Sequence, residues 1–371
     1  MSRIEGLMTR NSARLILHIA VGMVFALATI VLVFSGKSGA QRQNDSAQLE
    51  DSESATRADY CSQTARALYE ACKADVTDES FRKKAICINI SNEKEREQCF
   101  DDLDDAREEG NLRCSDQRNG RLNACRSLGE RRYDPSINPA LFDSDYTNLT
   151  HPNPYFPLRI SNRWEYRGGN EVNTVEILNQ TKLINGVTCI VVADRVLKDG
   201  DLAEDTDDWY CQAKNGNVWY FGEEVKDFES FAGDNPRLPE LVKIDGSFKF
   251  GRDGDKGGVF FSISPRRGDV YLEEFSVGNA EDITEILSTT YRFGSNPVLD
   301  QFVPQQLAQR FCSAGDCIVT KNSSLLEPGL FARKYYARGI GFFLEVKPDS
   351  GEVLQLTDCN FDPRCMNLPS P

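Results

Sequence analysis

Histidine is scarce in this chain: its 371 residues include only two, His18 and His151. His18 lies inside a long apolar run, and His151 lies in the proline-flanked segment NLTHPNP, which is typical of an exposed loop. A Ser-His-Asp or Cys-His arrangement would depend on His151 alone, and zinc hydrolases with several histidine ligands are excluded by count. We therefore assign no catalytic residue and no metal ligand.

Basic residues are outnumbered by acidic ones, with 43 Lys and Arg against 57 Asp and Glu and a formal net charge of −14. Because such a surface repels a phosphate backbone, we expect no nucleic-acid partner. The segment 199–208 holds six carboxylates, which is the ligand type that calcium prefers. It lacks the EF-hand spacing, and we interpret it as a solvated turn.

Long apolar runs are absent except for one, LILHIAVGMVFALATIVLVF at 15–34, which carries no charge. Twenty apolar residues suffice to cross a bilayer as a helix, whereas the apolar core of a signal peptide is usually shorter. We favour an uncleaved anchor over a signal peptide, although the small residues Ser38 and Ala40 follow the run. Three arginines precede it and predict a cytoplasmic N-terminus. Either alternative predicts export to the periplasm or the extracellular space, with membrane contact through 15–34.

Closely spaced Cys-x2-Cys pairs, which are typical of metal sites, are absent, although the chain has twelve cysteines. In an exported chain an even number of cysteines predicts disulfides. The first six are 11, 15, 12, 15 and 11 positions apart, an order that is the same in both directions. An antiparallel helical hairpin turning near residue 93 explains this symmetry, because residues equidistant from the turn lie opposite one another. The predicted pairs are Cys61–Cys125, Cys72–Cys114 and Cys87–Cys99.

Further details follow from this register. Gly110 should lie opposite Val76, and both helices should be interrupted there, in the first arm at the segment DVTD, 75–78. Ser91 or Asn92 should cap the second helix.

The other six cysteines are spaced for local cross-links. One pair is equidistant from Gly200, the predicted tip of a hairpin; another flanks a tight bend at Ala314-Gly315; the third closes a small loop near the C-terminus. The predicted pairs are Cys189–Cys211, Cys312–Cys317 and Cys359–Cys365. All twelve cysteines are then used, so no thiol remains as a nucleophile or a metal ligand.

Composition changes along the chain and predicts six segments. Residues 59–128 contain no proline and are rich in helix formers, whereas later residues form short Val-, Ile-, Tyr- and Phe-rich runs broken by Asn-Gly and Asp-Gly pairs. The segments are a signal anchor or signal peptide at 1–34, a flexible linker at 35–58, the stapled hairpin at 59–128, a proline-rich connector at 129–157, an antiparallel β domain at 158–358 and a C-terminal tail at 359–371. The predicted fold class is α+β: a disulfide-stapled antiparallel helical hairpin followed by an antiparallel β-meander of about ten strands, barrel-like or half-barrel.

Four blocks of the β domain carry a resemblance: NPYFPLRISNRWEYRGG, DDWYCQAKNGNVWYFGEE, LEPG and KYYARGIGFFLEV. They resemble an uncharacterised family of exported bacterial β-rich proteins, which often shows a YYAPGVGLV-like segment near the end of the domain. This chain has Arg338 where proline is usual. The likeness covers about 154–347, and some members carry a cysteine-bearing helical segment in front. The resemblance implies export and a β-rich architecture, and it implies no activity.

The sequence predicts an exported, membrane-anchored cell-envelope protein that is a binding or structural module and not an enzyme. It needs no cofactor, and its expected partner is an unknown envelope protein or a small ligand. The first alternative is a carrier of a lipid or small apolar ligand inside the barrel, lined by aromatic residues such as Trp209, Trp219 and Tyr220. The second is a hydrolase that uses two carboxylates and no histidine. A filled barrel would argue against the carrier, and two carboxylates converging in a cleft would favour the hydrolase.

Overall fold

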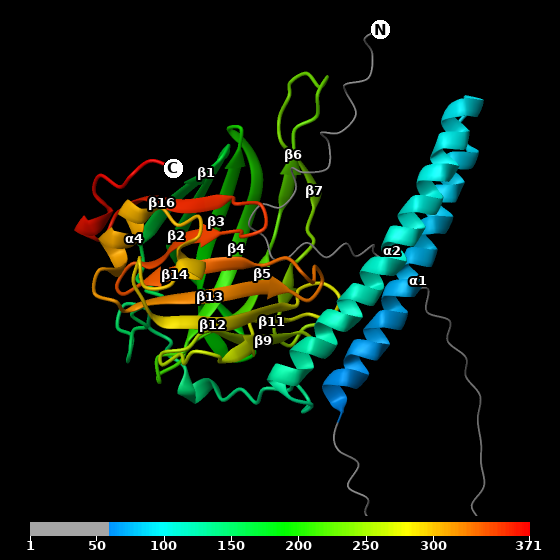
Figure 1. Cartoon of the computed structure of the whole chain (residues 1–371). Helices are drawn as coiled ribbons and strands as arrows, with labels where there is room; N and C mark the ends of the chain where they lie inside the picture. Colours follow the sequence, from blue (N-terminus) through cyan, green and yellow to red (C-terminus); the bar gives the residue numbers. More distant parts are fainter. Residues whose placement is uncertain (1–58) are drawn as a thin grey trace, which may run out of the picture.

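The computed structural model describes residues 59–371, which form a helical hairpin beside a β domain (Figure 1). The apolar run at 15–34 and the linker at 35–58 lie outside the described residues, so the predicted anchor and linker stay predictions. Of the helices within 59–371, none combines the length and the apolar composition needed to cross a membrane.

The hairpin consists of α1 (Tyr60–Ile88) and α2 (Glu93–Leu128), joined by a turn at 89–92. Asn92 caps α2, because its side-chain oxygen accepts hydrogen bonds from the amides of Lys94 and Glu95 at 3.0 and 3.2 Å. The predicted interruptions of the two arms are wrong, since both helices are continuous. In α1 the Thr77 hydroxyl donates to the carbonyl of Lys73, one turn earlier, and so does not cap a new helix.

Disulfides take the place of a core in this hairpin. The three predicted pairs, which join the outermost, middle and innermost cysteines, are confirmed. A Cβ atom on Gly110 would lie 2.9 Å from Cγ2 of Val76, so these residues face each other as the register predicts. Apart from cysteine, only Ala65 and Val76 are buried on α1. Such a small apolar interface needs covalent staples.

The β domain contains sixteen antiparallel strands, more than the ten or so predicted from the apolar runs. Extended pieces of two to four residues account for most of the difference, because they are too short to give an alternating pattern. The strands are β1 (Arg163–Gly168), β2 (Glu171–Ile184), β3 (Val187–Lys198), β4 (Asp201–Gln212), β5 (Val218–Glu224), β6 (Asp227–Glu229), β7 (Glu240–Lys243), β8 (Phe248–Lys249), β9 (Lys256–Phe261), β10 (Val270–Leu272), β11 (Glu274–Phe275), β12 (Asp282–Tyr291), β13 (Cys317–Ser324), β14 (Ala332–Ala337), β15 (Gly341–Val346) and β16 (Val353–Cys359). The short helices are η1 (Pro139–Leu141), α3 (Pro297–Asp300), α4 (Gln305–Cys312) and η2 (Pro363–Cys365).

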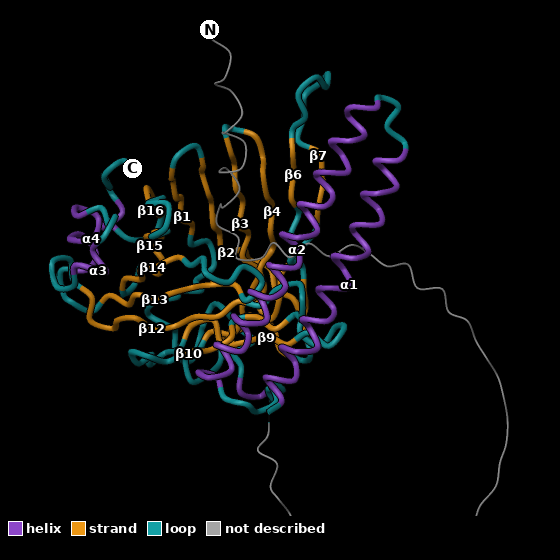
Figure 2. The backbone as a smooth tube through the Cα atoms, turned by 45° about the vertical axis from the view of Figure 1, so that its right-hand side comes forward, coloured by secondary structure: helices purple, strands orange, loops and turns teal. Residues whose placement is uncertain are grey.

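The strands form a nearly closed barrel, as the meander pattern predicts (Figures 1 and 2). Their order is β10-β12-β13-β14-β15-β16-β1-β2-β3-β4-β5-β9-β11, so the first strand pairs with the last. At the opposite side β9 approaches β10, where the Tyr271 hydroxyl donates to the carbonyl of Phe260 at 3.5 Å. A Cβ atom on Gly258 would lie 2.0 Å from the carbonyl oxygen of Leu272, so the close approach of the two strands requires glycine there.

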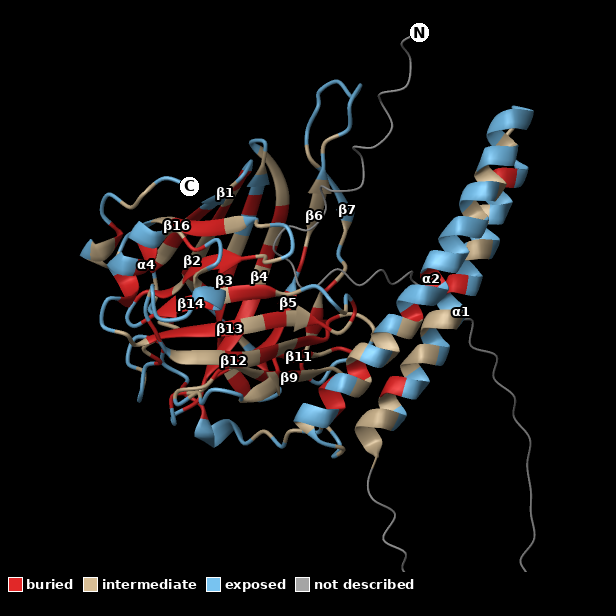
Figure 3. Cartoon of the chain, in the orientation of Figure 1, coloured by how far each residue is buried: buried red, intermediate tan, exposed pale blue. Residues whose placement is uncertain are grey.

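Strand alternation sorts the apolar residues into two clusters. The larger one fills part of the barrel interior and includes Tyr210, and the smaller one lies on the outer face and includes Trp209. The connector covers the outer cluster, because Phe142 packs there against the rings of Trp219 and Phe221. Figure 3 shows the buried residues concentrated in the barrel, whereas most of the hairpin surface is exposed.

The hairpin contacts the barrel through the C-terminal half of α2. The Arg121 guanidinium donates two hydrogen bonds, at 2.7 and 3.0 Å, to the carboxylate of Glu281, and both side chains are buried. Gln117 donates to the carbonyl of Leu326 at 2.8 Å. The turn of the hairpin points away from the barrel, on the same side as the β6–β7 extension (Figures 1 and 2).

Three further disulfides lie in the β domain and join Cys189 to Cys211, Cys312 to Cys317 and Cys359 to Cys365, the pairs that the spacing predicts. No cysteine of the described chain is free.

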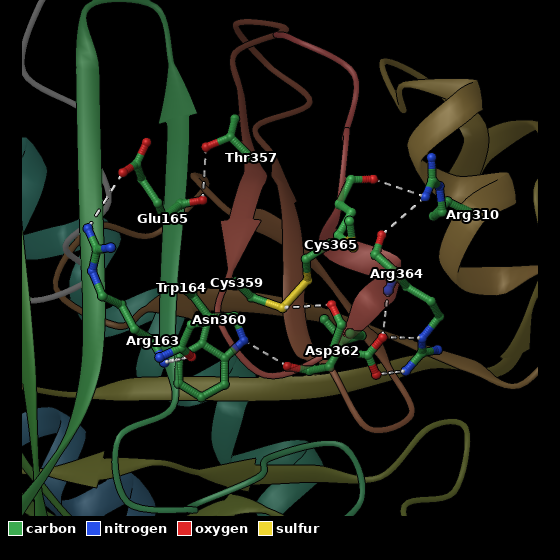
Figure 4. Close-up of a disulfide and its surroundings, with 12 residues drawn as sticks. Arg163, Trp164, Glu165, Arg310, Thr357, Cys359, Asn360, Asp362, Arg364 and Cys365 are labelled. Carbon is green, nitrogen blue, oxygen red and sulfur yellow. Dashed lines mark hydrogen bonds and ion pairs between the residues drawn. A yellow bond between two sulfur atoms is a disulfide. The ribbon is translucent and has the colours of Figure 1, made fainter.

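The last of these bridges fixes the C-terminal loop (Figure 4). Asp362 caps η2, and Arg310 of α4 donates to the carbonyl of Arg364 at 3.4 Å. The ring of Phe361 packs on Trp164 with centroids 4.9 Å apart. The loop therefore packs against Trp164 of β1, a residue whose side chain is buried in the barrel.

Candidate functional site

The barrel is not completely filled: a cavity of about 180 Å³ remains in its interior. Strand alternation positions its walls, because every second residue of a strand faces inward. On β2 these residues are Asn173, Val175 and Ile177, and on β3 they are Val192 and Asp194.

One part of the wall is aromatic. Phe156, Tyr210, Tyr220 and Phe260 line the cavity and contact one another. The ring centroids of Tyr210 and Tyr220 are 4.8 Å apart, and those of Phe156 and Phe260 are 4.9 Å apart. Burial raises the pKa of both tyrosines well above the ordinary value, so these rings stay uncharged.

The other part of the wall is acidic. Six carboxylates and one ammonium group line the cavity. The carboxylates belong to Asp194, Asp208, Glu223, Glu273, Glu274 and Asp282, and the ammonium to Lys334. Tyr220 connects the two parts, since its hydroxyl donates to Oδ1 of Asp208 at 2.5 Å.

Three of these acids lie at the start of β11 and β12: Glu273 directly precedes β11, Glu274 begins β11 and Asp282 begins β12. Glu273 is held in place, because its carboxylate accepts hydrogen bonds from the Thr284 hydroxyl and, at 3.1 Å, from the Asn322 amide. By contrast, Oε2 of Glu274 and Oδ1 of Asp282 have no hydrogen-bond partner, although both side chains are buried.

Burial is the main reason why these three acids hold their protons tightly. It raises the pKa of Glu273, and it raises the pKa of Glu274 and Asp282 well above their ordinary values. The charge of Asp282 raises the pKa of Glu274 further. That of Glu273 does the same to Asp282, whereas Lys334 acts in the opposite direction.

Asn173 is a polar side chain in the cavity wall that has no partner. It is 1% exposed, and neither its amide nitrogen nor its amide oxygen forms a hydrogen bond. Its neighbours across the sheet are Tyr166 on β1 and Val196 on β3. A buried amide without hydrogen bonds costs free energy, so Asn173 offers the cavity one unused donor group and one unused acceptor.

The acidic wall does not form a ready-made metal site. Within residues 59–371, the only three potential metal ligands whose atoms converge belong to Cys61, Cys125 and Glu130. Both sulfurs are bonded to each other in a disulfide and are not available as thiolates.

Two sequence interpretations change at this site. The segment 199–208 is not a solvated turn: only Asp199 and Gly200 form the tip, and the rest belongs to β4. Alternation along β4 therefore turns Asp208 into the barrel. Of the three aromatic candidates, Tyr220 lines the cavity, whereas Trp209 and Trp219 belong to the outer cluster.

His151 lies in an exposed loop, as predicted, with Nδ1 2.7 Å from the carbonyl oxygen of Lys214. It is not among the residues that line the cavity.

Sequence reasoning did not single out Asn173, Glu273, Glu274, Asp282 or Lys334. One signal was present: three of the four blocks that carry the resemblance, at 153–169, 207–224 and 334–346, supply more than half of the cavity wall.

No protein-family model matches the chain, and no curated protein matches it. Among solved structures, a "putative lipoprotein" from Parabacteroides distasonis ATCC 8503 is similar, with 9% sequence identity and a TM-score of 0.26. The match covers 56% of this chain and 99% of that chain. A likeness this weak carries no argument about the fold or the function.

Proposed function

We propose that this chain is an exported cell-envelope protein whose β domain binds a small ligand inside the barrel without transforming it. The cavity carries the proposal: protein interiors are normally close-packed, yet about 180 Å³ stays open beside the unpaired amide of Asn173.

Export is supported by the cysteines. All twelve form disulfides, which persist in oxidising compartments outside the cytoplasm. The apolar run at 15–34 is long enough to anchor the protein in the inner membrane. Fractionation of the expressing cells and N-terminal sequencing test both points: we expect the protein in the membrane fraction with its N-terminus intact, and a mature chain that begins near residue 41 would contradict the anchor.

The size of the cavity favours a small ligand over a lipid. A cavity of roughly 150 Å³ accommodates benzene, whereas pockets for drug-sized molecules span roughly 300–1,000 Å³. At about 180 Å³ the cavity holds one small molecule, and an acyl chain exceeds it.

A thermal-shift screen against small amines, sugars and carboxylic acids tests the binding role. The variant Val175→Phe places a ring in the cavity, and Thr174→Phe adds the same ring to the opposite face of β2. We expect compounds that stabilise the wild type to stabilise Thr174→Phe equally and Val175→Phe not at all. Equal stabilisation of both variants would place binding elsewhere.

A carboxylate-based hydrolase is the second candidate, favoured by one observation. The raised pKa of Glu274 and Asp282 is what a general acid requires. Hydrolysis of chromogenic glycosides and esters tests it. Turnover by the wild type that Glu274→Gln abolishes would replace the binding role with catalysis, and we expect no turnover.

A further inference from the structure

We propose that the ligand of the barrel cavity is a compact organic cation, with an ammonium, amidinium or guanidinium group and a small apolar body. This inference rests on the proposed function, because it names the class of ligand for the same cavity.

The acidic groups of the cavity wall outnumber its basic groups. Six carboxylates face one ammonium group inside a single cavity. A buried carboxylate is costly unless an opposite charge or several hydrogen bonds stabilise it. Lys334 is the only basic side chain among the residues that line the cavity. A cationic ligand would therefore favour the ionised form of the buried acids Glu274 and Asp282, which otherwise hold their protons.

The acids that are least satisfied point to the same chemistry. The carboxylates of Glu274 and Asp282 are both more than nine-tenths buried, and each has an oxygen without a hydrogen-bond donor. An ammonium, amidinium or guanidinium group carries only donors, which match these acceptors.

Asn173 provides an independent indication of a ligand. Its amide is 1% exposed and has neither a donor nor an acceptor as partner. It lies on β2, whereas Glu274 and Asp282 lie on β11 and β12. The unsatisfied groups thus come from different strands and share one cavity.

The aromatic part of the wall suits the body of such a ligand. Tyr210, Tyr220 and Phe260 present rings whose centroids are 4.8 to 5.7 Å apart. Aromatic faces attract cations, and the attraction reaches about 2 kcal/mol or more where water is excluded. The Tyr220 hydroxyl bonded to Asp208 joins this surface to the acidic one.

Other ligand classes fit less well. An anion would add charge of the sign already in excess, and a purely apolar molecule would leave the acids and Asn173 unpaired. A metal ion needs several converging oxygen ligands, and the cavity wall of the described chain contains no three carboxylates that converge. The cation is therefore organic.

Three probes of matched shape separate these classes: benzamidine is a cation, benzamide is neutral and benzoate is an anion. Calorimetry on the whole protein should show that benzamidine binds at least about tenfold tighter than benzamide, because one desolvated cation–π contact accounts for that ratio. Benzoate should not bind.

Two substitutions in the cavity wall and one outside it test whether the cavity causes the preference for benzamidine over benzamide. Asp282→Asn and Glu274→Gln should each lower the ratio between benzamidine and benzamide, and Glu285→Gln, on the outer face of β12, should leave it unchanged. Circular dichroism confirms that each variant is folded.

The results also separate this inference from the proposed function. If benzamide binds as tightly as benzamidine and Val175→Phe blocks both, the cavity binds ligands and the cation inference is wrong. If no probe binds the wild type, or if Val175→Phe binds all of them as well as the wild type does, both proposals are wrong.

Discussion

Asp208 on β4 and Glu223 on β5 lie directly opposite each other and both line the barrel cavity, although facing like charges destabilise a sheet. Tyr220 also faces inward, so regular alternation would turn Glu223 outward. A bulge reverses this: Tyr210 pairs with Tyr220 and Asp208 with Glu223, which leaves one extra residue on β5. The bulge thereby adds a second carboxylate to this part of the wall.

Replacing Gly222 in this bulge with alanine should destabilise the protein by about 3 kcal/mol. Gly222 has a φ of +131°, and a Cβ atom there would lie 2.2 Å from the carbonyl oxygen of Phe248. Backbone strain and overpacking each cost roughly 1–3 kcal/mol. Urea unfolding followed by tryptophan fluorescence measures the loss, since all three tryptophans lie in the β domain.

Gly200→Ala is the matched control for this prediction. Gly200 also has a positive φ, at +88°, but a Cβ atom there meets nothing within 4 Å. Its substitution should cost about 1 kcal/mol from the backbone conformation alone. Equal losses in the two variants would show that the contact with Phe248 does not decide the effect.

The ion pair between Arg121 and Glu281 should hold the hairpin against the barrel. Arg121→Ala leaves a buried carboxylate without its partner, which costs about 3–5 kcal/mol. We expect faster proteolysis of the hairpin and a lower midpoint in urea. Arg107→Ala removes an exposed pair with Asp104 on the same helix and should cost less than about 1 kcal/mol. A similar loss in both variants would contradict a docking role for Arg121.

Removal of the Cys61–Cys125 disulfide should destabilise the hairpin more than removal of Cys87–Cys99. The bridged residues are 64 positions apart in the first pair and 12 in the second, and the loss in chain entropy corresponds to about 4 and about 3 kcal/mol. Each pair is replaced by two serines, and far-UV circular dichroism follows the helices. The tryptophan transition of the β domain should stay in place; a parallel shift of that transition would mean that the two parts unfold together.

The two halves of the molecule were not equally predictable. The hairpin follows from cysteine spacing, because helices keep a fixed rise per residue and cross-links then require the mirror order. The cavity depends on features that a local pattern does not contain. Asp208 and Asp282 are far apart in sequence and line the same cavity only because the barrel closes. Glu223 faces inward only because of the bulge at Gly222. In the sequence, the acids of β4 therefore cannot be distinguished from those of a solvent-exposed strand face.

Burial of Asp282 should make the free energy of unfolding depend on pH, and the substitution Asp282→Asn tests the direction of this dependence. Burial first, and then the charge of Glu273, raises the pKa of Asp282 well above its ordinary value of 3.8, while Lys334 opposes this. Above about pH 4 the folded protein then binds more protons at this site than the unfolded chain does. The protonated carboxyl group of Asp282 therefore contributes its full stabilisation below that pH, and this contribution is lost as the pH rises through the raised pKa.

Asp282→Asn keeps the shape of the side chain and removes the titration, so it should stabilise the protein relative to the wild type by an amount that grows from about pH 5 to about pH 8. The quantity to compare is the difference in free energy of unfolding between variant and wild type. Exposed carboxylates with lowered pKa, such as Asp59 beside Gln63 and Arg66, affect both proteins equally and cancel. The other titratable groups of the cavity wall stay in both: Tyr166, Asp194, Asp208, Tyr210, Tyr220, Glu223, Glu273, Glu274, Lys334 and Tyr336. A difference that is constant with pH, or that shrinks as pH rises, would show that Asp282 is ionised in the folded protein throughout this range.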